Sequence, residues 1–210
     1  MTIRIMQLPL GPLQTNCYIL ACTTTRQAAV IDPAWDGLAI AREVEKQGWT
    51  VSHILLTHTH FDHVGGLAEL KERTGVMVYA HPDALPMLAR AADSAQMWGI
   101  AVETPLPPDQ LLQEGDVIEI GELRAHVLFT PGHAPGHVCF YLPEHSILFD
   151  GDVLFQGSIG RTDLPGGNFD LLTKSIREKL MTLPDETTVL SGHGPRTTIG
   201  QERRANPFLN

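Results

Sequence analysis

The spacing of apolar residues along the chain predicts a series of short strands and amphipathic helices. Short apolar runs that end at Gly, Pro or polar turn residues are typical of buried strands, and apolar residues three or four positions apart are typical of helices. We expect strands at residues 16–21, 27–32, 51–56, 76–80, 116–120, 123–129, 137–142, 146–149 and 187–190. We expect helices at residues 36–46, 66–73, 82–92 and 169–180, and at most a short helix over residues 199–210.

The order of these elements predicts two packed sheets with helices outside. The strands fall into two groups, each followed by helices, and a chain of 210 residues suits one domain spanning residues 1–210. Residues 93–108 contain no clear element but hold Trp98 and three prolines. This stretch is either a functional loop or a plain connection.

Composition narrows the function classes. The hydrophobic content of 43% and charged content of 19% are ordinary for a soluble globular protein. The net charge of −9 and the lack of a Lys/Arg run argue against nucleic acid as a partner. Residues 1–9 lack the apolar core of a signal peptide, and no apolar run is long enough to span a membrane. Three cysteines without CxxC spacing indicate core thiols in a reducing compartment, so we expect a cytoplasmic protein.

Residues 57–66 concentrate side chains that bind metals. His58, His60, Asp62 and His63 lie within six positions, on a turn between an expected strand and an expected helix. Neutral imidazole and carboxylate are ligands of zinc, iron and manganese. His58 and His60 can bind one metal from the same side, and Asp62 and His63 can face a second. A histidine-rich surface loop is the alternative, but this density of ligands argues against it.

Three later strand ends carry further candidate ligands. His133 follows a Pro-Gly turn, Asp152 follows a strand, and His193 lies between two glycines. If these ends converge, the two metal sets are His58, His60 and His133, and Asp62, His63 and His193. Asp152 can bridge the sets because a carboxylate has two oxygens. Asp150 is its rival, although the Gly-Asp pattern favours Asp152. His137 lies near His133 in the sequence and is a candidate to orient a ligand.

The ordered motifs resemble those of the metallo-β-lactamase superfamily. They are His58-x-His60-x-Asp62-His63, Thr130-Pro131-Gly132-His133, Gly151-Asp152 and Gly192-His193-Gly194. Residues 151–163 and 206–208 are similar to the short form of glyoxalase II, a hydroxyacylglutathione hydrolase. The resemblance implies an α+β chain folded as an αββα four-layer sandwich, which agrees with the order of the elements.

The resemblance also implies a reaction. It implies two divalent metals, with zinc favoured over iron or manganese. A hydroxide formed on these metals is expected to attack a thioester such as S-D-lactoylglutathione, giving a hydroxy acid and a free thiol. Asp62 accepts a proton or hydrogen bond from this hydroxide. Asp32 supports the metal-binding turn. Arg161 binds a glutathione carboxylate, or else is a surface residue paired with Asp163.

Other activities of the same superfamily remain open. A lactonase would use the same hydrolytic site, and a persulfide dioxygenase would use one iron with two histidines and an acid. A β-lactamase is less favoured, because Asp152 resembles the bridging acid of the glyoxalase branch. The acidic charge disfavours an RNA-processing nuclease, and the complete ligand set disfavours an inactive metal-binding module. The expected partner is a small-molecule thioester, with no nucleic acid and no membrane. The native metal, the acyl group and the oligomeric state stay open.

Overall fold

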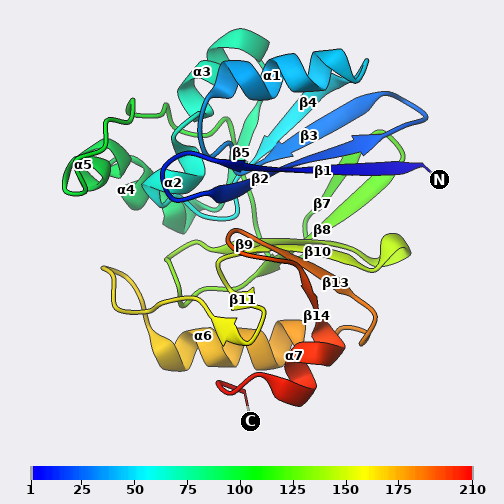
Figure 1. The fold of residues 1–210 in the computed structure, drawn as a ribbon, viewed down its shortest axis with the longest axis vertical. Coiled ribbons are helices and arrows are strands. Elements are labelled where there is room, and N and C mark those ends of the chain that lie inside the picture. The colour runs from blue at the N-terminus through cyan, green and yellow to red at the C-terminus, as the bar shows by residue number, and fades with distance from the viewer. Residues whose placement is uncertain (1, 210) are drawn as a thin grey trace.

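The computed structural model describes residues 2–209, and its strands form two sheets that lie face to face (Figure 1). The first sheet contains, in spatial order, β1 (Ile3–Leu10), β2 (Thr15–Cys22), β3 (Gln27–Ile31), β4 (Thr50–Leu55), β5 (Val78–Ala80) and β6 (Gln110–Leu111). The second contains β14 (Thr197–Thr198), β13 (Thr188–Ser191), β10 (Ile147–Gly151), β9 (Val138–Leu142), β8 (Leu123–Phe129) and β7 (Val117–Ile120). A separate hairpin is formed by β11 (Leu154–Phe155) and β12 (Ser158–Ile159).

Helices cover the outer face of each sheet. The first sheet carries α1 (Gly37–Lys46) and α3 (Leu67–Thr74), and the second carries α6 (Phe169–Ser175) and α7 (Ile199–Ala205) (Figure 1). A π-helical turn, η3 (Ile176–Leu180), continues α6. The shorter segments are α2 (Phe61–Val64), η1 (Pro82–Ala84), α4 (Leu85–Leu88), α5 (Ala91–Gln96) and η2 (Pro143–His145). The layers run helix, sheet, sheet, helix, which confirms the αββα sandwich.

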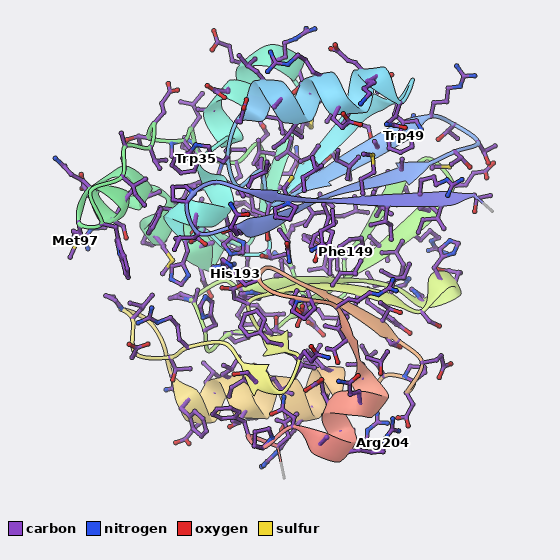
Figure 2. All side chains as sticks on the ribbon, viewed as in Figure 1. Trp35, Trp49, Met97, Phe149, His193 and Arg204 are labelled. Carbon is purple, nitrogen blue, oxygen red and sulfur yellow. The ribbon has the colours of Figure 1, made fainter. Side chains whose placement is uncertain are left out.

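Strand β2 shows why two sheets need two sets of apolar residues. All of its residues are buried. Cys17 and Ile19 belong to the cluster beneath the helices of the first sheet, whereas Tyr18 and Leu20 belong to the cluster between the sheets. Because successive side chains point to opposite faces, a strand buried on both faces is apolar along its whole length. Phe149 of the second sheet lies in the same central cluster (Figure 2).

The structure adds the short strands β6, β11, β12 and β14 to the expected elements and differs from them more clearly in two further places. Residues 3–10, to which no strand was assigned, form the edge strand β1, paired antiparallel with β2. The helix expected over residues 82–92 is divided into η1, α4 and the start of α5; Pro86 lies in the first turn of α4, where proline is tolerated, and the chain leaves the helical conformation at Arg90. Its last part, α5, extends into the stretch that was left without an element.

Among residues 2–209, the cysteines are core thiols, as the composition predicts. All three cysteines are buried and unpaired, so no disulfide frames the fold. None of the helices in this range combines the length and the apolar character needed to cross a bilayer.

Phe140 provides a test of the central core. Its side chain is fully buried between the sheets. We expect Phe140→Ala to lower the free energy of unfolding by about 3–5 kcal/mol, because it leaves a cavity that the sheets cannot close. Urea unfolding of the protein measures this value. Phe169→Ala is the control, since Phe169 is 49% exposed, and should change stability by less than about 0.5 kcal/mol. Similar losses in both variants would contradict the central core.

Candidate metal centre

The seven candidate ligands come from four strand ends that meet at one place. The first four lie on the loop after β4 and the single turn of α2. His133 follows β8, Asp152 follows β10, and His193 follows β13. Three groups have donor atoms close enough to hold a metal: His58 with His60 and His133, Asp62 with His63 and His193, and Asp32 with His58 and His63.

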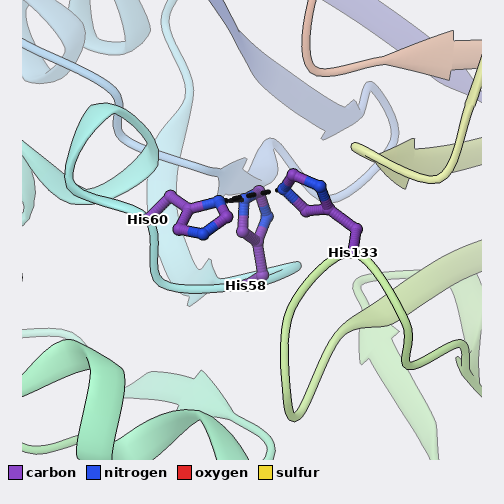
Figure 3. A group of neighbouring side chains, drawn as sticks. All are labelled: His58, His60 and His133. Atoms are coloured by element: carbon purple, nitrogen blue, oxygen red, sulfur yellow. Dashed lines mark hydrogen bonds between the residues drawn. The ribbon is translucent and has the colours of Figure 1, made fainter. Parts of the chain in front are cut away.

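The first cluster consists of three imidazole rings that converge on one point (Figure 3). His60 Nδ1 lies 3.0 Å from His58 Nε2 and 2.9 Å from His133 Nε2. His133 Nδ1 lies 2.8 Å from the carbonyl oxygen of Arg161, which can only accept a hydrogen bond. Nδ1 of His133 is therefore the donor, and its Nε2 presents a lone pair to the cluster.

His58 is held in the same tautomer by a chain of two hydrogen bonds. The Thr57 hydroxyl donates to Asp32 Oδ2 at 2.6 Å. The Thr57 hydroxyl oxygen itself lies 3.1 Å from His58 Nδ1. The hydroxyl proton is thus committed to Asp32, so His58 Nδ1 donates and Nε2 presents its lone pair. Two lone pairs now face His60 Nδ1, which can carry only one proton. A metal cation at this point could bind the lone pairs of the surrounding nitrogens, which a single proton cannot do.

Burial keeps the rings of this cluster neutral. Desolvation lowers the pKa of His58 well below its ordinary value. Desolvation, with the neighbouring His133 ring, lowers the pKa of His60 to about 3. Neutral imidazoles are the form that binds a metal ion. The electrostatics therefore fit a metal-binding cluster.

The second cluster leaves polar atoms without a partner. His63 Nδ1 lies 3.0 Å from Asp32 Oδ2, and its Nε2 points toward Asp62 Oδ2 at 3.7 Å. His193 Nε2 lies 3.2 Å from the same Asp62 oxygen. Among the described residues, His63 Nε2 and Asp152 Oδ1 are buried and have no hydrogen-bond partner. Buried polar atoms are seldom left unpaired, and a bound cation would engage both.

Asp152 lies between the two clusters. Its Oδ1 is 3.4 Å from His63 Nε2, and its Oδ2 is 3.6 Å from both His133 Nε2 and His193 Nε2. Gly192 makes room for this carboxylate, because a Cβ at that position would lie 2.3 Å from Asp152 Oδ1. Asp150 instead accepts a hydrogen bond from the Leu154 amide at 2.8 Å, and burial raises its pKa well above the ordinary value. The geometry of a bridging carboxylate is thus found at Asp152.

The two proposed supporting residues lie directly behind the ligands. Asp32 accepts hydrogen bonds from Thr57 N and Oγ1 and contacts His63. His137 Nε2 accepts from the Asp152 amide at 3.2 Å, and its ring stacks on His58 with centroids 4.9 Å apart. Asp32 therefore contacts a ligand of the second cluster, whereas His137 contacts a ligand of the first cluster and the backbone of Asp152.

Sequence reasoning missed Thr15 and Asn16. The Thr15 hydroxyl donates to Asp62 Oδ2 at 2.8 Å. The Asn16 amide group donates to the carbonyls of Ser191 at 2.9 Å and Gly194 at 3.1 Å, on either side of His193. The signal in the sequence was two polar residues at the start of an apolar strand.

The side chain and the carbonyl group of Arg161 make different contacts. Its guanidinium forms two hydrogen bonds of 2.8 Å with Asp163, which matches the surface-pair alternative. Its carbonyl oxygen, rather than its side chain, reaches the metal ligands through His133. The side chain still lines the cavity above the centre, so a substrate contact stays a prediction.

The metal centre opens into a cavity of about 830 Å³. Two stretches line it on opposite sides: residues between 83 and 98, and residues between 155 and 166. His60, Asp62, His133, Asp152 and His193 also line it, which places five of the seven candidate ligands within reach of a bound molecule. Cavities of this size hold small organic ligands.

Comparison with known proteins identifies the family. The model of the metallo-beta-lactamase superfamily matches residues 10–193, and the chain belongs to this superfamily. The chain is 45% identical to the probable metallo-hydrolase YqgX of Bacillus subtilis, over 97% of this chain and 96% of that protein. It is 38% identical to the hydroxyacylglutathione hydrolase GloC of Haemophilus influenzae, with the same coverage.

Solved structures agree with the fold. The B3 metallo-beta-lactamase BLEG-1 matches with a TM-score of 0.92 and 43% identity, over 98% of this chain and 99% of that chain. TTHA1623 in a di-iron-bound form matches with a TM-score of 0.90 and 44% identity, over 97% and 100%. ETHE1 from Myxococcus xanthus matches with a TM-score of 0.79 and 31% identity, over 97% and 83%. The His and Asp clusters are consistent with a dinuclear metal site, and one similar structure holds two irons.

The two aspartates beside β10 allow a matched test of the bridge. We expect Asp152→Asn to reduce the metal content from about two ions per chain to one or fewer, because an amide lacks the charge that faces both clusters. Asp150→Asn should keep nearly the full metal content, since its carboxylate bonds to a backbone amide instead. Elemental analysis after metal loading measures both. The opposite ranking would show that Asp150 is the bridge.

Proposed function

We propose that the protein is a dinuclear metal-dependent hydrolase of thioesters, with S-D-lactoylglutathione or a related S-acylglutathione as substrate. The observation that carries this proposal is the carboxylate of Asp152 between two groups of converging donors on the floor of a cavity. Two divalent metals at such a site would activate water at neutral pH and polarise a carbonyl group. Zinc is the first candidate, with iron and manganese as alternatives.

The residues of the chain prepare the site for hydrolysis. The Arg161 carbonyl and the Asp32–Thr57 pair fix the tautomers of His133 and His58, so lone pairs point inward. Thr15 fixes Asp62. Although burial alone would raise it, contact with His63 and His193 lowers the pKa of Asp62 to about 2. Asp62 is therefore charged at neutral pH and can accept a hydrogen bond from the attacking water.

The proposed reaction needs no covalent intermediate with the chain. The oxygen of water forms the new bond to the acyl carbon, the carbon–sulfur bond breaks, and the released sulfur takes up a proton. The support for a glutathione thioester is the 38% identity to a protein named hydroxyacylglutathione hydrolase. The broader support is the 45% identity to a probable metallo-hydrolase.

A second candidate is the one-iron oxidation of a persulfide. The match to ETHE1 favours it, since that structure covers 97% of this chain. The second cluster, Asp62 with His63 and His193, supports hydrolysis, because it offers three donors for a second metal. The number of metals bound per chain therefore separates the candidates.

The test of the proposed function is hydrolysis of S-D-lactoylglutathione by the metal-loaded protein. We expect free thiol to appear with turnover well above the rate in buffer, to fall to that rate after chelation, and to return on adding zinc, iron or manganese. Thiol release is followed by colorimetry. Oxygen consumption with glutathione persulfide, together with no thiol release from the thioester, would favour the dioxygenase instead.

Arg161 provides a test of the glutathione carrier. If its guanidinium exchanges Asp163 for a glutathione carboxylate, Arg161→Ala should raise KM for a glutathione thioester roughly five- to tenfold and change kcat little. A small thioester without carboxylates is the control substrate and should be hydrolysed as before. Steady-state kinetics on both substrates measures this. Equal losses on both would mean that the side chain only stabilises the loop.

A further inference from the structure

The segment from residue 83 to residue 98 has two faces. One face is buried against the first sheet, with the helical spacing of Ala84, Leu88, Ala91 and Ala95. The other face lines the cavity and includes Asp83, Met87, Arg90, Ser94, Met97 and Trp98. Within α4 and within α5 the helix repeats every 3.6 residues, so the core contacts of the first face fix the directions of Met87 and Ser94. The side chains of the second face are thus aimed into the cavity by the fold.

The outer end of this second face, beyond the polar Asp83, Arg90 and Ser94, is apolar and exposed. Met97 is 88% exposed and Trp98 is 57% exposed, and both lie at the outer end of the segment (Figure 2, where Met97 is labelled). An exposed helix face normally carries polar residues. The Trp98 ring lies 6.4 Å from the ring of Phe61, which stands between the candidate ligands His60 and Asp62 in the sequence. Aromatic contact therefore links the outer end of the segment to the metal centre.

The opposite side of the cavity carries apolar groups as well. Phe155 lines it, and its ring lies 6.4 Å from that of His193. Apart from the candidate metal ligands, the charged residues of the lining are Asp83, Asp93, Arg90 and Arg161. Two acidic and two basic residues leave no net charge. The charges of this part of the cavity are therefore balanced.

We propose that Met87, Met97 and Trp98, called here the apolar wall, bind an apolar acyl chain of the substrate, and that Trp98 sets the preference for its length. This inference rests on the proposed thioester hydrolase and specifies its acyl group. Each methylene that leaves water against such a surface favours binding by about 0.8 kcal/mol, or about fourfold. Substrates with medium-length alkyl acyl groups should thus be preferred over short ones.

The kinetic test uses S-acylglutathiones from acetyl to octanoyl with the metal-loaded protein. We expect kcat/KM to rise along the series by roughly two- to fourfold per methylene, because burial at the wall is partial. Trp98→Ala should lower the octanoyl-to-acetyl ratio of kcat/KM by about tenfold, and Trp98→Phe should restore most of it. Phe169→Ala removes an aromatic side chain outside the cavity lining and should leave the ratio unchanged.

A binding test separates this inference from the proposed function. The thioethers S-octylglutathione and S-methylglutathione cannot be hydrolysed, and calorimetry measures their affinities directly. We expect the octyl compound to bind at least roughly tenfold more tightly, and Met97→Glu to reduce this preference by placing a charge on the wall. The 88% exposure of Met97 keeps this variant from disturbing the core.

The outcomes of the two tests are distinct. Hydrolysis without any dependence on chain length, or a ratio that Trp98→Ala and Met97→Glu leave unchanged, overturns the apolar wall and leaves the hydrolase intact. The hydrolase proposal is contradicted if no thioester is hydrolysed. The apolar wall is then still supported as a binding surface if S-octylglutathione binds more tightly than S-methylglutathione and Trp98→Ala removes this difference. Equal binding of the two thioethers overturns the wall whatever the activity.

Discussion

One buried carboxylate, that of Asp32, organises both halves of the metal centre. It accepts hydrogen bonds from the amide and hydroxyl of Thr57, and through that hydroxyl it fixes His58 in the first cluster. The Oδ2 atom of Asp32, which accepts from the Thr57 hydroxyl, also lies 3.0 Å from Nδ1 of His63 in the second cluster. Loss of a buried acceptor leaves its donors unpaired, which costs about 1–3 kcal/mol for each group. The geometry of the two clusters therefore depends on a residue that lies behind the ligands.

The centre also depends on the packing of the two sheets. The first residues of β2, in one sheet, bond to Asp62 and to the turn that carries His193, which follows a strand of the other sheet. The ligands can keep their positions only while the central core holds the sheets together. Metal binding would in turn stabilise the fold, because its free energy is available only to the folded chain. Stability and site geometry are therefore coupled in this protein.

Chemistry and specificity are separated within the cavity. The floor consists of fixed histidines and aspartates from strand ends, which the motifs of the superfamily share. The walls come from the broken helical segment before residue 98 and the loop after β12. These walls face solvent and can change without loss of the core. Similar floors can then serve proteins with different substrates, which is why the fold alone does not fix the acyl group or the carrier.

The sequence by itself determined the donor types, their order and the two-sheet architecture, because strand periodicity and closely spaced ligands are local signals. It missed β1, an edge strand with no fully buried residue that forms by pairing with β2. It also missed the break at Arg90, between α4 and α5, in the segment that lines one side of the cavity. Only the tertiary structure decided the tautomers of His58 and His133, the support of Asp62 by Thr15, and the pairing of Arg161 with Asp163. Several of these contacts join residues far apart in the chain, and all depend on side-chain directions, so no local pattern could encode them.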